Sequence, residues 1–432
     1  MLYRLAKILM RTGLRLFYRH VYVSGMEHIP AQGPVIIIAN HPSSLMDAAL
    51  LGVLLKRPLW YFTRGDVFIN RPVRKVLAWL HMIPVHPHEK GRSSIGANDE
   101  SFLAARRILR RNGIIVFFPE STSHTEHQLW PFRKGVFRLA FQTMADAGFS
   151  LRLPIVPIGI TYDHPVAGRQ CVQVHAGAPL EMDDYTGLYQ TSPSAALLRM
   201  VKDAQERVGY EALHIQQTDR CTVAKQCLTI YRNNHPSRSI SAWKIASRSR
   251  LQQEQAICRR INEVGEIELK AIKEKNEAYF DVLAKYGLED RTIAGPVEVR
   301  ALTNINGWKC LLLWAGFPLW LAGLVLNGLP IWTARRIADS KVSREDFYSW
   351  IFVSCCCLLY TLWAIVLTGS AWVFGWQYAV VLLLLMPLSG LFSYYYFDWK
   401  LEFEQDRKLR RLSEQEIKTL SQMRLGINTQ NL

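Results

Sequence analysis

The stretch PVIIIANHPSSLMD, residues 34–47, decides the fold class of this chain. It joins an uninterrupted apolar run to a histidine and then to a segment that can start a helix. Similar short apolar runs, with helical stretches between them, recur at residues 58–62, 82–85, 114–118, 153–161 and 172–176. Runs of this length are typical of strands that are buried on both faces of a sheet. The sequence therefore predicts an α/β domain.

The histidine of this stretch, His41, follows the first predicted strand, where α/β proteins usually bind ligands. Pro42 disfavours helical backbone at His41, so Ser43 or Ser44 can cap the helix that comes next. Asp47 then lies in the first turn, from which its carboxylate can fold back to the imidazole. In such a pair the carboxylate fixes the tautomer, while the other ring nitrogen takes a proton from an attacking hydroxyl. The alternative is that Asp47 only completes a capping box with Ser44.

A second polar stretch, FPESTSHTEHQLWPFRKG at residues 118–135, follows another predicted strand. Glu120 is expected at the edge of the sheet where His41 emerges. An acidic group, hydroxyls and cations near one histidine suit a polyol phosphate, because the cations bind the phosphate and Glu120 binds a free hydroxyl. The candidate hydroxyls are Ser121, Thr122 and Ser123, and the candidate cations are Arg133, Lys134, Arg64 and Arg92.

The motifs NHPSSLMD (40–47), FPESTS (118–123) and LPIVPIGIT (153–161) resemble those of the glycerolipid acyltransferases. The likeness covers residues 20–180. It implies transfer of a fatty acyl group from acyl-CoA or acyl carrier protein to a hydroxyl of glycerol 3-phosphate or lysophosphatidic acid, without a metal or organic cofactor. It also implies that His41 is the general base and Asp47 its orienting partner. Glu120 and its neighbours Ser121 and Thr122 would belong to the acceptor site.

Three positions depart from the pattern of that family. Five residues separate His41 from Asp47, where four are usual. Ser121 replaces a common glycine, so any positive φ there would be strained. Pro87 stands where an arginine is expected, which leaves the phosphate contact to another cation. The candidates for that contact are Lys90, Arg92 and Arg64.

Composition divides the chain into five segments. Residues 1–26 hold no acidic residue and carry basic side chains at helical spacing, which predicts an amphipathic helix lying on anionic lipid. A helix that only caps the core of its own domain is the alternative. Residues 27–195 form the acyltransferase-like domain, residues 196–308 a polar helical region without a strand pattern, and residues 400–432 a basic cytosolic tail.

Between these, residues 309–399 contain three uncharged runs at 311–332, 347–368 and 372–397. Each exceeds the roughly 20 residues that a membrane-spanning helix needs, and tryptophans and tyrosines cluster at their ends. Basic clusters follow the first and third runs, so three crossings would place the catalytic domain away from the cytosol and its acyl-CoA. Because Pro318 and Pro330 interrupt the first run, we expect it to be re-entrant or interfacial. The other two runs would form a spanning hairpin in a bacterial inner membrane or the endoplasmic reticulum, with the catalytic domain facing the cytosol.

Composition also excludes several classes of protein. The 432 residues carry a net charge of +16 at a mean hydropathy of +0.01, which fits neither a disordered protein nor a uniformly apolar membrane bundle. The eight cysteines form no CxxC pair and indicate reduced thiols. No nucleic-acid motif accompanies the positive charge, which favours anionic lipid as the partner.

Two alternatives to an acyltransferase remain at this point. A metal-dependent hydrolase would need a ligand set that lacks a recognised spacing, drawn from His86, His88, His124, Glu126 and His127. The other alternative is a membrane-associated lipid-binding or scaffold protein that keeps the fold without turnover, because of Ser121 and Pro87. A requirement for acyl-CoA distinguishes the enzyme from both.

Overall fold

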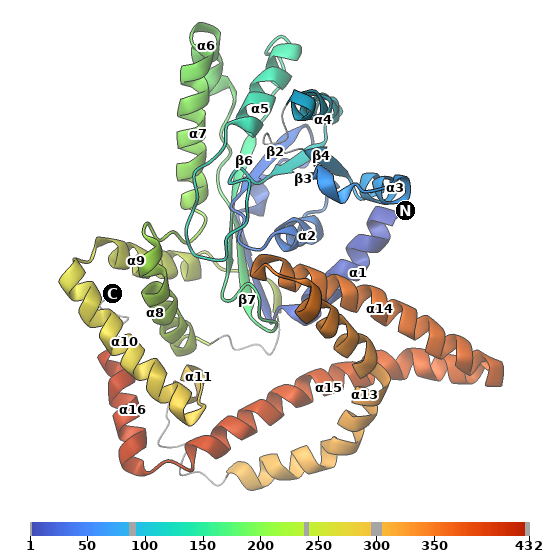
Figure 1. Ribbon diagram of the computed structural model, residues 1–432, viewed down its shortest axis with the longest axis vertical. Coiled ribbons are helices and arrows are strands. Elements are labelled where there is room, and N and C mark those ends of the chain that lie inside the picture. Colours follow the sequence, from blue (N-terminus) through green and yellow to red (C-terminus); the bar gives the residue numbers. More distant parts are fainter. Residues whose placement is uncertain (1, 86–91, 237–241, 295–304, 428–432) are drawn as a thin grey trace. The chain divides into compact units, whose positions relative to one another are not determined.

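A computed structural model describes residues 2–85, 92–236, 242–294 and 305–427, without the side chains of 92–98, 242, 305–306 and 308. The chain forms two compact units (Figure 1). We call the first the sheet unit; it comprises Met1–Gln216, Ile240–Gln255 and Ser343–Trp350. We call the second the helical unit; it comprises Gln217–Ser239, Ala256–Val342 and Ile351–Leu432.

The sheet unit is built on eight strands in the order β4-β3-β5-β2-β6-β7-β1-β8. All neighbouring strands are parallel except β6 and β7. The predicted α/β class is confirmed, and all six predicted strands are present: β2 (Val35–Ala39), β3 (Leu59–Arg64), β4 (Met82–Val85), β5 (Ile114–Phe117), β6 (Ile155–Tyr162) and β7 (Cys171–Ala176).

Two further strands lie where the sequence analysis placed none. β1 (His20–Ser24) falls within the segment 1–26 that was predicted as one helix, and the helix α1 (Leu2–Phe17) ends before it. β8 (Ala242–Ala246) falls within the predicted polar helical region. Both are five-residue strands that pair with each other at one side of the sheet. Their stability comes from sheet pairing rather than from a long apolar run, which explains why periodicity missed them.

Helices cover both faces of this sheet. All five residues of β2 are buried, and alternate residues such as Ile36 and Ile38 pack in one apolar cluster with Phe137 and Met200. The helices of the unit are α1, α2 (Leu45–Leu54), α3 (Arg71–Trp79), α4 (Arg92–Arg110), α5 (Gly135–Asp146), α6 (Asp183–Thr191) and α7 (Pro193–Gly209), with short 3-10 helices at Met26–His28 and Gly65–Val67. α9 (Ser249–Glu263) begins in the sheet unit and ends in the helical unit.

The amphipathic helix α1 packs on its own domain with one face and exposes the other. Lys7 donates to the carbonyl of Leu55, and Leu14 is fully buried, so one face packs on the domain. On the other face Leu5 and Ile8 remain 51% and 62% exposed. The helix thus caps its own domain and still presents apolar side chains outward.

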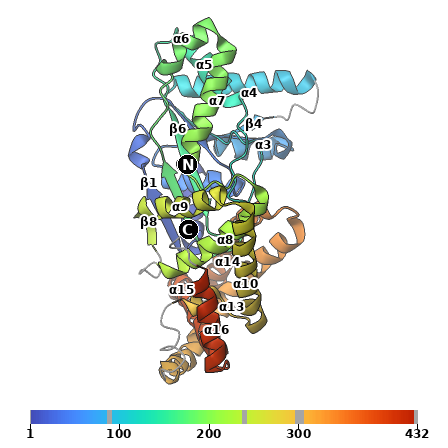
Figure 2. The same cartoon turned by 90° about the vertical axis from the view of Figure 1, so that its left-hand side faces the viewer.

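The helical unit consists of α8 (Cys221–Asn234), α10 (Glu266–Tyr286), α11 (Asp290–Ile293), α13 (Ile305–Lys341), α14 (Glu345–Phe374), α15 (Trp376–Leu409) and α16 (Glu414–Gly426), with a short 3-10 helix at Thr218–Arg220. Helices α8, α10 and α16 lie side by side (Figures 1 and 2). Their core includes Tyr279, Leu409 and Leu420. Residues 400–409 and 414–426, predicted as part of a basic tail, are therefore helical and packed.

Helices α13, α14 and α15 are long and apolar enough to cross a membrane, by length and composition. Their apolar side chains are largely exposed, with Val373 and Phe374 above 80%. This confirms the three apolar segments. The prolines predicted to interrupt the first segment do not end the helix, because α13 continues through Pro318 and Pro330 to Lys341. The ribbon of α13 instead changes direction along its length (Figure 1), as expected where proline removes a backbone donor.

Candidate active site

The end of strand β2 positions the candidate base. Asn40 follows β2, and its side-chain oxygen accepts from the backbone N–H of Ile160 at 2.7 Å, while its amide donates to the carbonyl of Ile160 at 2.9 Å. These two bonds tie the chain to the neighbouring strand β6. The next residue, His41, is therefore held at the carboxyl edge of the sheet. The sequence analysis assigned no role to Asn40.

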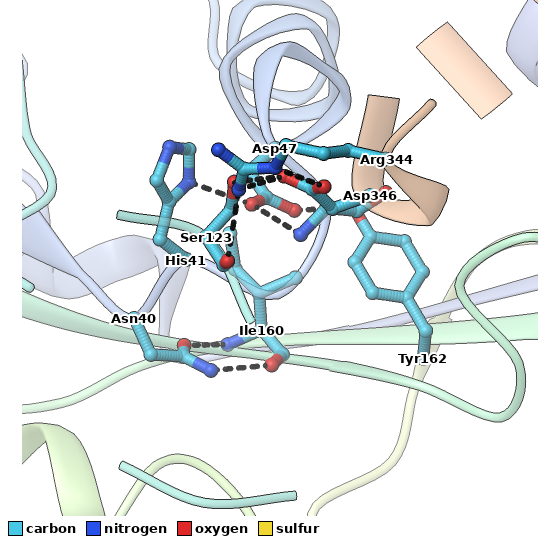
Figure 3. A network of polar contacts seen from close by, with 9 residues as sticks. Asn40, His41, Asp47, Ser123, Ile160, Tyr162, Arg344 and Asp346 are labelled. Atoms are coloured by element: carbon cyan, nitrogen blue, oxygen red, sulfur yellow. Dashed lines mark hydrogen bonds and ion pairs between the residues drawn. The ribbon is translucent and has the colours of Figure 1, made fainter. Parts of the chain in front are cut away.

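Asp47 is fully buried and accepts three hydrogen bonds (Figure 3). One carboxylate oxygen accepts from Nδ1 of His41 at 2.9 Å and from the backbone N–H of Ser43 at 2.9 Å. The other accepts from the hydroxyl of Tyr162 at 2.7 Å. Ser44 makes no side-chain cap bond, so the reciprocal capping box is not formed. Asp47 therefore stabilises the helix start and orients the imidazole at the same time.

The turn between β2 and α2 makes this contact possible. Ser44 has a φ of 47°, a left-handed value that is unusual for a residue with a side chain. The backbone N–H of Asp47 donates to the carbonyl of Ser44, so the helix begins immediately after the turn. The carboxylate can then reach back to His41 although six positions separate the two residues. Such strain is found where the surrounding structure supports a functional site.

The imidazole of His41 stacks on the ring of Phe118, with centroids 4.0 Å apart and planes 13° apart. Phe118 follows β5, the strand beside β2. With Nδ1 donating to the carboxylate of Asp47, the basic lone pair of a neutral ring lies on Nε2. Nε2 is therefore the atom that can accept a proton from a substrate.

Glu120 lies in the loop after β5 and is only 6% exposed. Burial, followed by the negative charge of Asp47, raises its pKa to about 8, although a hydrogen bond from the backbone of His41 opposes the shift. Its Oε1 is buried without a hydrogen-bond partner among the described residues. At neutral pH the side chain is therefore mostly a carboxylic acid, which can both donate to and accept from a hydroxyl.

This geometry can be set against known proteins. Residues 20–161 match the acyltransferase family. We call this matched stretch the acyltransferase domain. The match contains His41, Asp47 and Glu120, and it begins at the strand β1 and ends within β6.

The relatives of this acyltransferase domain are distant. A 1-acyl-sn-glycerol-3-phosphate acyltransferase from Cocos nucifera is 29% identical over 164 residues, which cover 35% of this chain and 47% of that protein. One from Bacillus subtilis (strain 168) is 26% identical over 183 residues, 41% of this chain and 82% of that protein. The crystal structure of the 1-acyl-sn-glycerophosphate (LPA) acyltransferase PlsC from Thermotoga maritima has a TM-score of 0.34 and 18% identity, covering 47% of this chain and 78% of that one. The matched stretch spans about half the length of the coconut protein.

The loop after Glu120 bonds back to the residue that carries the imidazole. Ser121 has a φ of 69°, so the positive φ that a glycine would favour is present in a serine. Thr122 bonds Nε2 of His124 at 2.8 Å, and His124 stacks on Trp130. The backbone N–H of His124 donates to the carbonyl of His41 at 3.0 Å. We call residues 118–133 the acceptor loop.

The cations that were candidates for binding phosphate lie at different places in the structure. Arg64 ends β3, two strands from β2, and pairs on the surface with Asp66 at 2.5 Å. Lys134 is exposed at the start of α5. The side chain of Arg92 and the residues Pro87 and Lys90 lie outside the described residues. The identity of the phosphate ligand therefore stays a prediction.

Two neighbouring residues that no sequence motif indicated do contact the acceptor loop. Asp346, at the start of α14, accepts a hydrogen bond from the hydroxyl of Ser123. Arg344 pairs with Asp346 at 2.8 Å (Figure 3). These residues follow the acceptor loop by more than 200 positions, so only the tertiary structure could reveal them. Tyr162 is a similar case, because its role depends on β6 lying beside β2.

The described residues hold no group of three or more side chains that could bind a metal ion. Of the hydrolase candidates, His86 and His88 lie outside the described residues. His124 is occupied by Thr122 and Trp130. The geometry that the site does present is an oriented imidazole beside a neutral carboxylic acid.

Proposed function

We propose that the acyltransferase domain transfers a fatty acyl group from acyl-CoA or acyl carrier protein to a hydroxyl of glycerol 3-phosphate or lysophosphatidic acid. The observation that carries this proposal is the bond between His41 and the buried Asp47, at the position where the family motif lies. Relatives in several organisms bear the name 1-acyl-sn-glycerol-3-phosphate acyltransferase, which supports a glycerol phosphate as the acceptor.

The reaction follows from the placement of the imidazole. Nε2 of His41 takes the proton of the acceptor hydroxyl as its oxygen attacks the thioester carbonyl carbon. A carbon–oxygen bond forms, the carbon–sulfur bond breaks, and the imidazolium returns the proton to the leaving thiolate. Asp47 stabilises the imidazolium between these steps. The acyl group passes directly to the acceptor, without an acyl-enzyme.

Glu120 is the proposed contact for the second hydroxyl or ester oxygen of the acceptor. Its raised pKa keeps it neutral, so it does not repel a phosphorylated substrate. As an acid it can donate one hydrogen bond and accept others. Ser121 and Thr122 add hydroxyls on the same loop.

Purified full-length protein in lipid or detergent tests the proposal when each acceptor is supplied in turn with labelled acyl-CoA and acyl carrier protein. We expect an ester product with at least one acceptor. His41→Ala should lower the rate about 10²–10⁴-fold, the scale of a general base. His235→Ala, which changes an exposed histidine just after α8 that bonds the carbonyl of Tyr231, is the matched control. Absence of acyl transfer by the wild type would support the scaffold alternative, and a trapped acyl-serine or acyl-cysteine would refute direct transfer.

We further propose that α1 lies on the surface of an anionic membrane. Its outward face carries Leu5, Ile8 and Leu16 beside Arg4 and Arg11, which are all exposed. Apolar side chains bordered by arginines suit the boundary between anionic headgroups and acyl chains. An environment-sensitive fluorophore at Ile8→Cys should report an apolar setting in anionic vesicles; a spectrum unchanged from that in detergent-free buffer would contradict this.

For the membrane helices we propose that α14 and α15 cross as a hairpin, while α13 enters and returns on the side of the acyltransferase domain. Residues 343–350, which follow α13 and include the first turns of α14, belong to the sheet unit, and this supports the arrangement. A single crossing by α13 would carry them to the opposite side. Cysteine labelling at Lys341 and Gly369 tests it: Gly369→Cys should react from outside the cell, whereas reaction of Lys341→Cys from outside would refute it.

A further inference from the structure

The junction between α13 and α14 lies on the sheet unit, next to the acceptor loop. Residues Ser343–Trp350 belong to that unit, although the described part of α13 up to Lys341 and the rest of α14 from Ile351 belong to the helical unit. The hydroxyl of Ser349 donates to the carbonyl of Pro165 at 2.6 Å and is buried. The hydroxyl of Ser123 donates to the carboxylate of Asp346. A segment 223 positions away in sequence therefore contacts the acceptor loop.

Asp346 is the centre of this junction. Its side chain is only 7% exposed, so its charge needs partners. Oδ1 accepts from Nε of Arg344 at 3.1 Å, and Oδ2 accepts from Nη2 of Arg344 at 2.8 Å and from Ser123. The carboxylate therefore holds a guanidinium on one side and the acceptor loop on the other.

Arg344 is held in a geometry that leaves part of it available. The fork to Asp346 uses Nε and one hydrogen of Nη2, and Nη2 also lies 3.4 Å from the carbonyl of Ser123. The guanidinium carbon lies 5.2 Å from the ring of Phe347, and the side chain remains 51% exposed. Its Nη1 group, with two N–H donors, is not used by these contacts. A planar guanidinium that is already ordered binds an oxyanion at a lower entropic cost than a mobile one.

A short path of contacts connects this guanidinium to the candidate base. Arg344 contacts Ser123, and the next residue, His124, donates its backbone N–H to the carbonyl of His41 at 3.0 Å. The side chain of His124 lies within the electrostatic reach of both Arg344 and His41. The cation and the base therefore border the same small region, and Glu120 belongs to the same loop.

We propose that Arg344 binds the phosphate group of the acyl acceptor, and that Asp346 is a positioning residue that orders Arg344 and the acceptor loop together. This inference rests on the proposed function. The ligand chemistry is a phosphomonoester, which glycerol 3-phosphate and lysophosphatidic acid share. Residues at the start of α14 and just before it thereby complete a site whose base comes from the acyltransferase domain.

Kinetics of full-length variants test this proposal. Arg344→Gln should raise the KM for the phosphorylated acceptor about 10–100-fold, the scale of lost charge-assisted hydrogen bonds, with little change in the KM for acyl-CoA. Arg344→Lys should recover part of the loss, because a lysine keeps the charge and loses the fork. Asp346→Asn should raise the same KM. The matched control is Arg152→Gln, an exposed arginine paired with Glu181 ahead of β6, which should change neither KM.

The acceptors distinguish the source of the phosphate. Glycerol 3-phosphate and lysophosphatidic acid are assayed separately, and monoacylglycerol serves as the acceptor without phosphate. The KM for monoacylglycerol should be the same in wild type and Arg344→Gln. An equal rise in KM for all three acceptors in Arg344→Gln would overturn phosphate binding by Arg344. The same conclusion would follow if Arg64→Gln raised the KM for the phosphorylated acceptors and Arg344→Gln did not.

Binding measurements separate this inference from the proposed function. In the His41→Ala background, lysophosphatidic acid and inorganic phosphate are titrated against detergent-solubilised protein, with and without Arg344→Gln. If Arg344→Gln abolishes binding of lysophosphatidic acid and phosphate, the result supports the role of Arg344. This holds even if the wild type shows no acyl transfer, and in that case only the proposed function fails. Equal binding by both proteins, at the same thermal midpoint, overturns the inference and leaves wild-type turnover as the separate test of function.

Discussion

Asp47 in the sheet unit and Asn327 in the helical unit are both buried polar side chains with several hydrogen bonds, but their surroundings indicate different roles. In the sheet unit Asp47 accepts from His41, Ser43 and Tyr162. In the helical unit Asn327 of α13 donates to the carbonyl of Gly323 at 2.8 Å and to Ser389 of α15 at 3.3 Å. It also accepts from Tyr360 of α14 at 2.7 Å. Each centre is a single side chain that joins separate elements.

The difference between the centres lies in their charge and surroundings. Asp47 is ionisable and bonds an imidazole at the edge of the sheet, where a substrate can reach the other ring nitrogen. Asn327 is neutral, its partners Gly323, Ser389 and Tyr360 are neutral, and it is 4% exposed between apolar helices. Hydrogen bonds of this kind hold membrane helices together. We therefore propose a catalytic role for the Asp47 centre and helix association for the Asn327 centre.

The largest expected effect comes from Asp47→Asn. The amide oxygen can still accept from Ser43 and from Nδ1 of His41, and the amide nitrogen can donate to Tyr162. The fold should persist, but a neutral amide cannot stabilise the imidazolium. We expect the acyl-transfer rate to fall about 10²–10⁴-fold with a small change in thermal midpoint. The control is Asp184→Asn, an exposed residue of α6; full activity of Asp47→Asn would reduce Asp47 to a helix cap.

Glu120→Gln should change how stability depends on pH. The pKa of Glu120 is about 8 in the folded protein and about 4.5 when the chain is unfolded. Between these values only the folded state keeps the proton, so the wild type loses stability as the pH rises, by at most about 1.4 kcal/mol per pH unit for one proton. Glu120→Gln removes that loss.

The measurement is the difference in thermal midpoint between wild type and Glu120→Gln from pH 4.5 to 8.5. We expect the thermal midpoint of the wild type to decrease relative to that of Glu120→Gln as the pH rises. The control Glu206→Gln, an exposed change on α7, should show the same pH dependence as the wild type. Asp47→Asn should move the Glu120 transition to lower pH, because the charge of Asp47 raises this pKa. A difference that is independent of pH would contradict a raised pKa.

Asn327→Ala should affect stability and leave catalysis unchanged. The variant removes one bond to each of two neighbouring helices and leaves the hydroxyl of Tyr360 without its acceptor. Such bonds between membrane helices contribute about 0.6–2 kcal/mol. We expect a lower thermal midpoint in detergent and an unchanged kcat.

Thr361→Ala is the matched control for Asn327, since its hydroxyl bonds only Cys357 of its own helix. Its midpoint should stay close to that of the wild type. A large loss of kcat in Asn327→Ala, at a temperature where the variant is folded, would remove the contrast between the two centres.

Much of the fold was predictable because its signals are local. Six strands and three apolar helices appear as runs of apolar residues, whose burial or membrane insertion depends on composition alone. β1 and β8 escaped because each is a five-residue strand stabilised by its partner strand. Helix α13 continues through Pro330 because the indole N–H of Trp363 in α14 donates at 2.8 Å to the carbonyl of Leu326, the acceptor that Pro330 leaves without its helical donor.

The residues of the site also differ in whether local sequence could predict them. The bond between His41 and Asp47 lies within eight residues of one turn, so spacing and capping rules could indicate it. The contributions of Tyr162, Arg344 and Asp346 depend on which strands and segments meet in space. No local pattern carries that information. Three of the predicted phosphate ligands, Arg64, Arg92 and Lys134, were inferred from charge alone, and charge does not specify position.

The smallest expected effect belongs to Ser121, where a local rule did predict strain. A side chain at a positive φ costs roughly 1–2 kcal/mol, and Ser121 has a φ of 69°. Ser121→Gly removes that cost but adds about 0.5–1 kcal/mol of chain entropy to the unfolded state. The net expectation is a stabilisation of a few tenths to about 1 kcal/mol. Ser194→Gly, in the first turn of α7, has no strain to relieve and should destabilise.

Thermal midpoints of the two serine variants therefore should move in opposite directions. The KM for the acceptor then separates the backbone of Ser121 from its hydroxyl. If the hydroxyl binds the acceptor, Ser121→Gly stabilises the protein and raises this KM. If only the turn matters, the KM stays constant while the midpoint rises. If the thermal midpoint of Ser121→Gly instead falls as far as that of Ser194→Gly, the backbone of the acceptor loop is not strained at Ser121. A serine would then suit the turn as well as a glycine does.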